Sequence, residues 1–63
     1  MKQIQKLRKK HGMSQAALAE MLGVTSSTVA KWESAEAYPR TQLLPKIAKI
    51  FNCSIDDLFK DIS

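Results

Sequence analysis

One stretch of the chain, Ser14 to Ser34, constrains the fold most strongly, and its sequence is SQAALAEMLGVTSSTVAKWES. A residue suited to capping a helix opens each half, and apolar residues then recur at the spacing of one helix face. These residues are Leu18, Ala19 and Leu22 in the first half and Val29 and Trp32 in the second. Gly23 stands between the halves, where glycine can take the left-handed conformation that ends a helix. The stretch therefore predicts a helix, a tight turn and a second helix.

The offsets within this stretch also indicate how the two helices pack. Ala19 is small enough to lie where two helices cross at close range, and Val29 suits a shared core. Ser26, Ser27 and Lys31 then lie on the side of the second helix that faces away from that core. Such a face of short or flexible side chains can enter a groove. The same pattern also fits a plain helical hairpin whose serines are merely solvated.

Three further helical segments flank this pair, so the sequence predicts an all-α fold of five helices. The first runs from about Lys2 to His11, with Ile4 and Leu7 on its apolar side. The fourth has Pro45 in its first turn, where proline's missing N–H would have no helical acceptor. Its expected buried stripe is Leu44, Ile47, Ala48 and Phe51, and Asn52 is expected to end it. The fifth follows Ser54-Ile-Asp-Asp57, which resembles a capping box.

The length and composition narrow the possible functions. We expect one domain, residues 1–63, with a small core. The single Cys53 has no disulfide partner within the chain and no metal-ligand cluster around it, so we expect a cytoplasmic protein with no metal and no cofactor. No apolar run could span a membrane. No combination of nucleophile and base suggests an enzyme or a small-molecule substrate, and the lone His11 lacks catalytic partners.

The charge is unevenly distributed along the chain, which has a formal net charge of +4. Up to Lys31 there are six basic residues and one acidic residue, whereas from Trp32 onward there are four basic and five acidic residues. The basic half contains the predicted helix-turn-helix, so its field favours a polyanion at that end. A lysine-rich first helix is also, by itself, commonly just a solvated face.

The segment SQAALAEMLGVTSSTVAKWE, followed by YP and then by LLPKIAKIFNCSIDDLF, resembles the phage repressor and Cro-type (XRE) family. The resemblance covers about Ile4 to Phe59, nearly the whole chain. It implies a compact lambda-repressor-like domain that binds double-stranded DNA as a homodimer on a pseudo-palindromic operator and regulates transcription, typically by repression. Residues 25–34 would form the recognition helix in the major groove. The same fold could alternatively serve as an antitoxin or anti-repressor module that binds another protein.

The resemblance also implies roles for individual residues. Those that would read base edges are Ser26, Ser27 and Lys31. Those that would contact phosphates are Ser14, Gln15, Thr25, Thr28 and Arg40. Arg8 would form an ion pair with Glu33. The dimer contact would involve Leu58, Phe59 and Ile62, although closure of the core fits Leu58 equally well.

The chain departs from the family at Ala35 and Glu36, where relatives usually have a glycine and often a basic residue. We expect Ala35 to take the left-handed conformation that glycine has in relatives, because Tyr38-Pro39 still closes the loop. The alternative is that the third helix continues through Ala35. Trp32 is expected in the core rather than stacked on an unpaired base.

Overall fold

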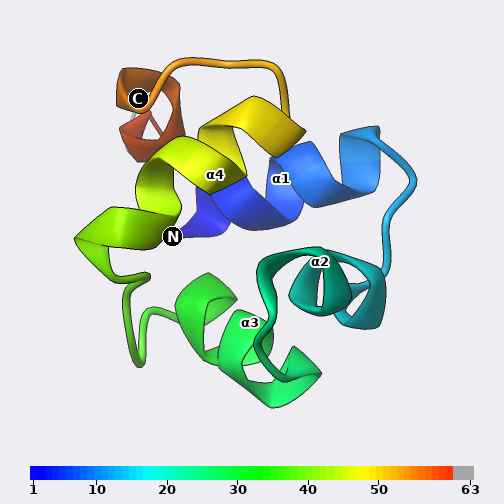
Figure 1. Cartoon of the computed structure of the whole chain (residues 1–63). Helices are drawn as coiled ribbons and strands as arrows, with labels where there is room; N and C mark the ends of the chain where they lie inside the picture. Colours follow the sequence, from blue (N-terminus) through cyan, green and yellow to red (C-terminus); the bar gives the residue numbers. More distant parts are fainter. Residues whose placement is uncertain (61–63) are drawn as a thin grey trace.

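The structure is a computed structural model that describes residues 1–60. Its helices form where the apolar periodicity and the capping residues predict them. The elements are α1 (Lys2–Lys10), α2 (Gln15–Leu22), α3 (Ser26–Glu33), the 3-10 turn η1 (Thr41–Leu43), α4 (Leu44–Ile50) and the 3-10 turn η2 (Asp56–Phe59). Figure 1 shows α2 and α3 together at one end of the molecule, with α1 and α4 across the core from them. The central stretch is therefore a helix-turn-helix, as predicted.

The fifth α-helix is not confirmed, because the part of the chain that the structure describes contains four α-helices. The capping box itself is present, with the Ser54 N–H donating to Asp57 Oδ2 and the Asp57 N–H donating to Ser54 Oγ, each at 3.1 Å. Beyond it the Leu58 N–H donates to Ile55 O at 3.0 Å, a bond that spans three residues. A segment of one turn favours this tighter geometry, because longer helices are needed to offset the cost of nucleating an α-helix.

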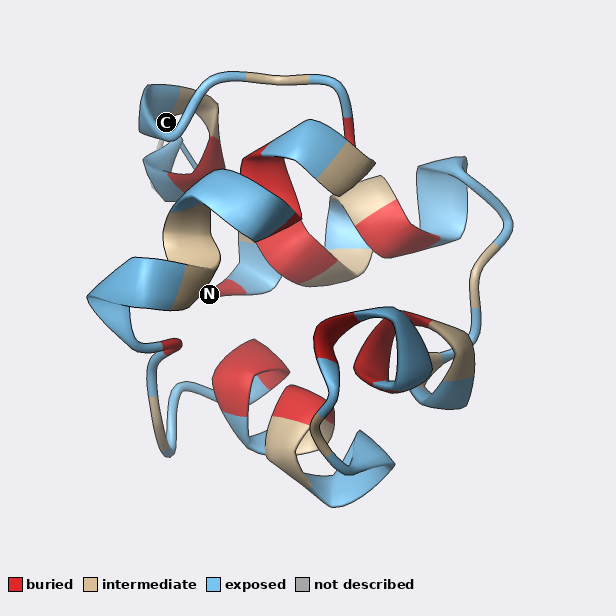
Figure 2. Ribbon diagram, viewed as in Figure 1, coloured by how far each residue is buried: buried red, intermediate tan, exposed pale blue. Residues whose placement is uncertain are grey.

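The core lies between the helix-turn-helix and the pair formed by α1 and α4, and Figure 2 shows the buried faces turned inward. Its most deeply buried large side chains are Ile4, Leu18, Val29, Ile47 and Leu58. Each contributes about 1.5–3 kcal/mol by leaving water. Ala19 is 2% exposed, as expected for a small residue at a close helix crossing, and Trp32 is 3% exposed. The predicted apolar faces are thus the packed ones, although Leu44 is only half-buried.

Each α-helix ends in the same left-handed turn. The residues with positive φ are Gly12 (67°), Gly23 (72°), Ala35 (66°) and Asn52 (53°). The next N–H in each case bonds back to a carbonyl five residues earlier: Met13 to Arg8, Val24 to Ala19, Glu36 to Lys31 and Cys53 to Ala48, at 2.9–3.0 Å. This is the Schellman arrangement, which satisfies carbonyls that a helix end would leave unpaired. Ala35 is left-handed as we expected, and helix α3 ends at Glu33.

Replacing Ala35 with glycine should stabilise the protein. The Cβ of an L-residue with a φ of 66° crowds its own backbone, a strain of about 1–2 kcal/mol that exceeds the extra unfolded-state entropy of glycine. We expect Ala35→Gly to raise the free energy of unfolding by about 0.5–1 kcal/mol in urea titrations. The matched control is Gly23→Ala, where φ is 72° and no atom lies within 4 Å of the added Cβ, so only backbone strain should lower stability. A destabilised Ala35→Gly variant would contradict the left-handed assignment.

Candidate nucleic-acid interface

Helix α3 is held by one side and exposed on the other. It buries Val29, Trp32 and Glu33 against the rest of the molecule. The residues expected to read bases, Ser26, Ser27 and Lys31, are all exposed. In Figure 1, α3 lies at one edge of the molecule, on the side away from α4. The structure thus gathers the three candidate base-reading residues on one accessible face.

Hydroxyl groups cap the two helices of the motif. Ser14 Oγ accepts a hydrogen bond from the Ala17 N–H at 3.0 Å, and Thr25 Oγ1 accepts one from the Thr28 N–H at 3.2 Å. The Thr25 and Thr28 hydroxyls also contact each other at 2.9 Å. Capping uses acceptor lone pairs and leaves the hydroxyl proton of Ser14 free to donate. These groups stand at helix N-termini, where unpaired N–H groups and the helix dipole favour an anion.

A buried ion pair fixes α3 to α1, and it is the Arg8–Glu33 pair expected above. Arg8 Nε donates to Glu33 Oε2 at 2.7 Å and Nη2 donates to Oε1 at 3.2 Å, a two-pronged contact between residues that are 8% and 9% exposed. The third nitrogen, Nη1, donates to Met13 O at 2.8 Å. Among the described residues, no buried side-chain nitrogen or oxygen lacks a hydrogen-bond partner. The pair therefore meets the condition under which buried charges are tolerated.

The same carboxylate also holds Gln15, a contact that the sequence did not reveal. Gln15 Nε2 donates to Glu33 Oε1 at 3.0 Å, a bond that uses one of the two hydrogens of the amide. Glu33 thereby contacts side chains from both α1 and α2. The only sequence signal for this link was that Gln15 shares the inward side of α2 with Leu18 and Leu22.

The electrostatic environment keeps Glu33 ionised. Burial raises the pKa of Glu33, but the hydrogen bonds from Arg8 and Gln15 and the charges of Arg8 and Lys9 outweigh it, so the pKa lies below its ordinary value of 4.5. At neutral pH this carboxylate is a stable acceptor for both α1 and α2.

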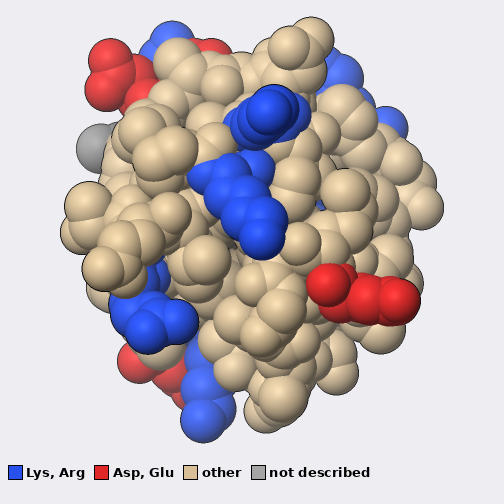
Figure 3. Space-filling model, in the orientation of Figure 1, with Lys and Arg blue, Asp and Glu red and all other residues tan. Residues whose placement is uncertain are grey.

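The surface charge does not follow the halves of the sequence. Of the six basic residues up to Lys31, five lie on α1, and α4 adds Lys46 and Lys49. Around the helix-turn-helix, Lys31 and Arg40 are offset by the exposed Glu20 and Glu36. Figure 3 shows basic side chains over α4 and a second basic group near the segment that follows α3. The basic residues of the first half of the sequence therefore lie mainly on α1 and not on the helix-turn-helix itself, because sequence halves are not molecular faces.

The candidate dimer residues separate into different environments. Leu58 is fully buried, so it closes the core and cannot contact a second copy. Phe59 is 50% exposed, whereas Ile62 lies outside the described residues. The structure adds the loop residue Tyr38, which is 66% exposed and precedes the buried Pro39. Its one sequence signal is an aromatic residue in a polar loop.

Other chemical features are sparse within residues 1–60. No helix there is long and apolar enough to cross a membrane. That part of the chain also contains no group of three or more metal-ligating side chains. Cys53 is a free, half-buried thiol, and burial together with the charge of Asp57 raises its pKa. A raised pKa lowers the thiolate fraction and with it the reactivity of the thiol.

Comparison with known proteins identifies relatives across most of the chain. The helix-turn-helix family HTH_3 matches residues 4–58. An uncharacterized HTH-type transcriptional regulator of Archaeoglobus fulgidus is 41% identical over 56 residues, which cover 89% of this chain and 80% of that protein. The HTH-type transcriptional activator BcrR of Enterococcus faecalis is 40% identical over 55 residues, covering 87% of this chain and 27% of BcrR. Repressor protein C2 of Salmonella phage P22 is 40% identical over 53 residues, covering 84% of this chain and 24% of C2. No solved structure matches significantly.

The buried ion pair should show strong coupling in a double-mutant cycle. Arg8→Met leaves Glu33 desolvated without its partner, so we expect the free energy of unfolding to fall by roughly 3 kcal/mol or more. The double variant Arg8→Met/Glu33→Leu removes both charges and should recover much of that loss. The measurement is urea denaturation of the four proteins in the cycle. Additive losses would show that the 2.7 Å contact contributes no coupling.

The lowered pKa of Glu33 predicts a specific loss of stability in acid. A carboxyl group whose folded pKa is depressed stabilises the fold above its unfolded pKa, and this contribution disappears as pH falls through the folded value. We therefore expect wild type to lose stability relative to Arg8→Met/Glu33→Leu as the pH falls below 4.5. Asp57, whose pKa is lowered to about 2 by its bonds to Lys60 and Ser54, is present in both proteins and cancels. A difference independent of pH would contradict an ionised Glu33.

Proposed function

Because this chain belongs to the helix-turn-helix family HTH_3, we propose that it is a sequence-specific transcriptional regulator that binds double-stranded DNA. The observation that carries this proposal is the two-sided character of α3. One side is fixed by Trp32 and the Arg8–Glu33 pair, and the other presents Ser26, Ser27 and Lys31 to solvent. A rigid helix with an open polar face fits the major groove, which admits an α-helix.

The proposed contacts divide into base reading and backbone positioning. Lys31 donates to guanine O6 and N7, whereas Ser26 and Ser27 bond to several bases and discriminate weakly. Their short side chains allow close approach, so DNA shape supplies part of the specificity. Ser14, Gln15, Thr25, Thr28 and Arg40 are proposed to hold phosphates. The second hydrogen of the Gln15 amide and the cap at Ser14 support this assignment at the start of α2.

We further propose that the protein acts as a homodimer on a pseudo-palindromic operator and represses transcription by excluding polymerase. In helix-turn-helix dimers generally, the half-sites lie about 34–36 Å apart, one turn of DNA. We regard η2 as the fifth helical element of a lambda-repressor-like arrangement, with Phe59 as its exposed contact residue. Among the relatives, one is named an activator and another a repressor protein. The chain spans about a quarter of the length of each of these two, so the activity of a whole protein is part of the proposal.

A protein-interaction role, as an antitoxin or anti-repressor, is the second candidate. The observation in its favour is the absence of a basic excess around α2 and α3, where Glu20 and Glu36 offset Lys31 and Arg40. DNA binding that is weak and insensitive to salt would favour this role, because phosphate contacts release counterions and make affinity salt-dependent.

Two substitutions distinguish a base contact from a phosphate contact. After an operator is selected from a random duplex pool, Lys31→Ala should lose about 1–3 kcal/mol of binding free energy on that operator only. Arg40→Ala should weaken binding to all sequences and reduce the slope of log K against log salt by about one unit. Glu36→Lys, the control of opposite sign, should tighten binding to all sequences. Equal losses for Lys31→Ala on every duplex would remove Lys31 from the base-reading set.

A further inference from the structure

Helices α1 and α4 carry a concentration of positive charge that the proposed contacts with an operator do not use. Their sequences, KQIQKLRKK and LPKIAKI, contain seven basic residues and no acidic residue. Arg8 is buried and paired with Glu33, whereas the six lysines of these helices are exposed. Both helices lie across the core from the helix-turn-helix (Figure 1), so this charge is not on the exposed face of α3.

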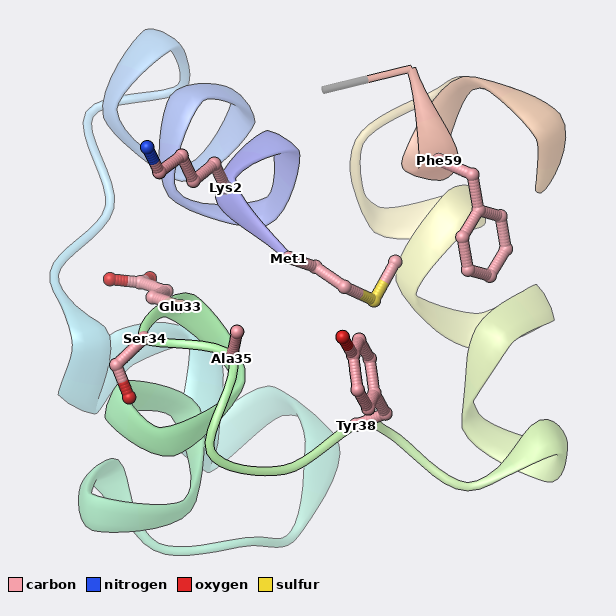
Figure 4. A pocket seen from close by; sticks show the side chains of 7 residues that line it. All are labelled: Met1, Lys2, Glu33, Ser34, Ala35, Tyr38 and Phe59. Atoms are coloured by element: carbon pink, nitrogen blue, oxygen red, sulfur yellow. The ribbon is translucent and has the colours of Figure 1, made fainter. Parts of the chain in front are cut away.

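Two of the six lysines lie near the C-terminal end of α3. The charge of Lys9 lowers the pKa of Glu33. Lys2 and Glu33 line one cavity of about 640 Å³ at the end of α3, which Figure 4 shows. The other four lysines form the surface that we call the basic face, which consists of Lys6, Lys10, Lys46 and Lys49.

A ring contact brings the two halves of the basic face together. His11 and Phe51, the residues that follow α1 and α4, have ring centroids 5.5 Å apart. The last turns of the two helices, which contain Lys10 and Lys49, therefore lie side by side. Lys6 is one turn before Lys10, on the side of α1 opposite the buried Ile4. Figure 3 shows basic side chains over α4 and others at the neighbouring edge, with no acidic side chain between them.

The charges of the basic face are not balanced within the fold. Among residues 1–60, none of its four lysines forms an ion pair. Like charges one turn apart on a helix repel each other. Lys46 also lies in the first turn of α4, where the helix dipole disfavours a cation. Lys46 is therefore unfavourable for the stability of α4, and residues that break a local rule in this way are expected at functional sites.

The lack of apolar anchors on these helices favours a nucleic-acid duplex as the partner. Among the described residues, the exposed large hydrophobic side chains are Met21, Tyr38, Ile55 and Phe59, and none of them lies on α1 or α4. Protein interfaces have aromatic or other apolar anchors at their centre, and membrane-bound helices insert apolar side chains. Single-stranded nucleic acid stacks its bases on aromatic rings. The phosphate backbone of a duplex requires only cations.

We propose that the basic face binds the phosphate backbone of a second DNA duplex, so that the protein bridges two segments of DNA. The first segment is the operator held by α3, and for that segment alone the inference rests on the proposed function. The second contact is independent of sequence, because lysine ammonium groups neutralise phosphates and read no bases there.

The test is energy transfer between two labelled duplexes. A donor-labelled duplex carries the complete selected operator, so the helix-turn-helix motifs of a dimer are occupied, and an acceptor-labelled duplex lacks operator sequence. The protein is equimolar with the half-sites, and the second duplex is titrated at low ionic strength. We expect wild type to bring the two duplexes together, and we expect the transfer to fall steeply as salt is added.

Neutralising the α4 part of the basic face should weaken the bridge. We expect Lys46→Gln/Lys49→Gln to raise the concentration of second duplex needed for half-maximal transfer at least about tenfold. The slope of log K against log salt for that duplex should fall by about 1.8, since each phosphate contact contributes about 0.9. Operator affinity should stay within about twofold of wild type. The matched control is Lys60→Glu, which also lowers the net charge from +4 to +2, because Lys60 follows η2 and pairs with Asp57 outside the basic face.

Thermal unfolding distinguishes a binding role for Lys46 from a structural one. Lys46→Glu places an acidic residue in the first turn of α4 and three residues before Lys49, and both changes favour the helix. We therefore expect this variant to unfold at a temperature no lower than wild type while losing energy transfer. A lower unfolding temperature would show that Lys46 supports the fold and would overturn the inference.

The remaining outcomes separate this inference from the proposed function. Unchanged transfer in Lys46→Gln/Lys49→Gln, or no transfer with wild type at any salt concentration, would overturn the inference. An equal loss of operator affinity would also overturn it, because the lysines would then contact the first duplex. Tighter binding to phosphatidylglycerol vesicles or to polyglutamate than to the second duplex would assign the basic face to a membrane or to an acidic protein instead. If wild type prefers no operator, the proposed function fails, and the effect of the double variant on binding to a random duplex still decides the inference.

Discussion

The buried contact between Arg8 and Glu33 is the constraint on which the rest of this small structure depends. It joins the first helix to the end of α3, and through Gln15 it also reaches the start of α2. This carboxylate accepts hydrogen bonds from several donors, so it can remain charged when buried. Removing any one of those donors leaves part of the buried charge without a hydrogen-bond partner. Apolar packing alone would permit small rotations of α3 about its axis. The directional bonds restrict that rotation, so the polar face of α3 points outward.

Much of the fold could be predicted from the sequence because its determinants are local. Capping by Ser14 and Thr25, the spacing of Leu18 and Leu22, and the turn at Gly23 each depend on residues only a few positions apart. The form of the segment after Ser54 could not be predicted in the same way. Whether it becomes an α-helix or a 3-10 turn depends on how the segment packs against α1, and that contact joins opposite ends of the described chain.

Only part of the candidate site could be predicted from the sequence. The resemblance to phage repressors supplied the Arg8–Glu33 pairing, and the exposure of Ser26, Ser27 and Lys31 followed from helical periodicity. The hydrogen bond between Gln15 and Glu33 was not predicted, because the sequence is equally consistent with Gln15 as a polar residue in the first turn of α2. The distribution of charge was also missed, since one-dimensional order does not say that α1 lies across the core from the exposed face of α3. Surface properties of this kind arise only when distant segments are assembled.

The left-handed alanine after α3 has a consequence for motion as well as for stability. A helix end that has glycine or asparagine at its left-handed position releases little backbone strain when it opens. The turn at Ala35 releases more, because alanine is strained in the left-handed conformation. Local opening there therefore has a lower free energy than at the ends of the other helices. The bond that closes this turn runs from the Glu36 N–H to Lys31 O, and Lys31 is one of the residues proposed to read bases. Helix α3 is thus held through its last residue by the ion pair, and the part that opens most readily is the turn that follows Glu33.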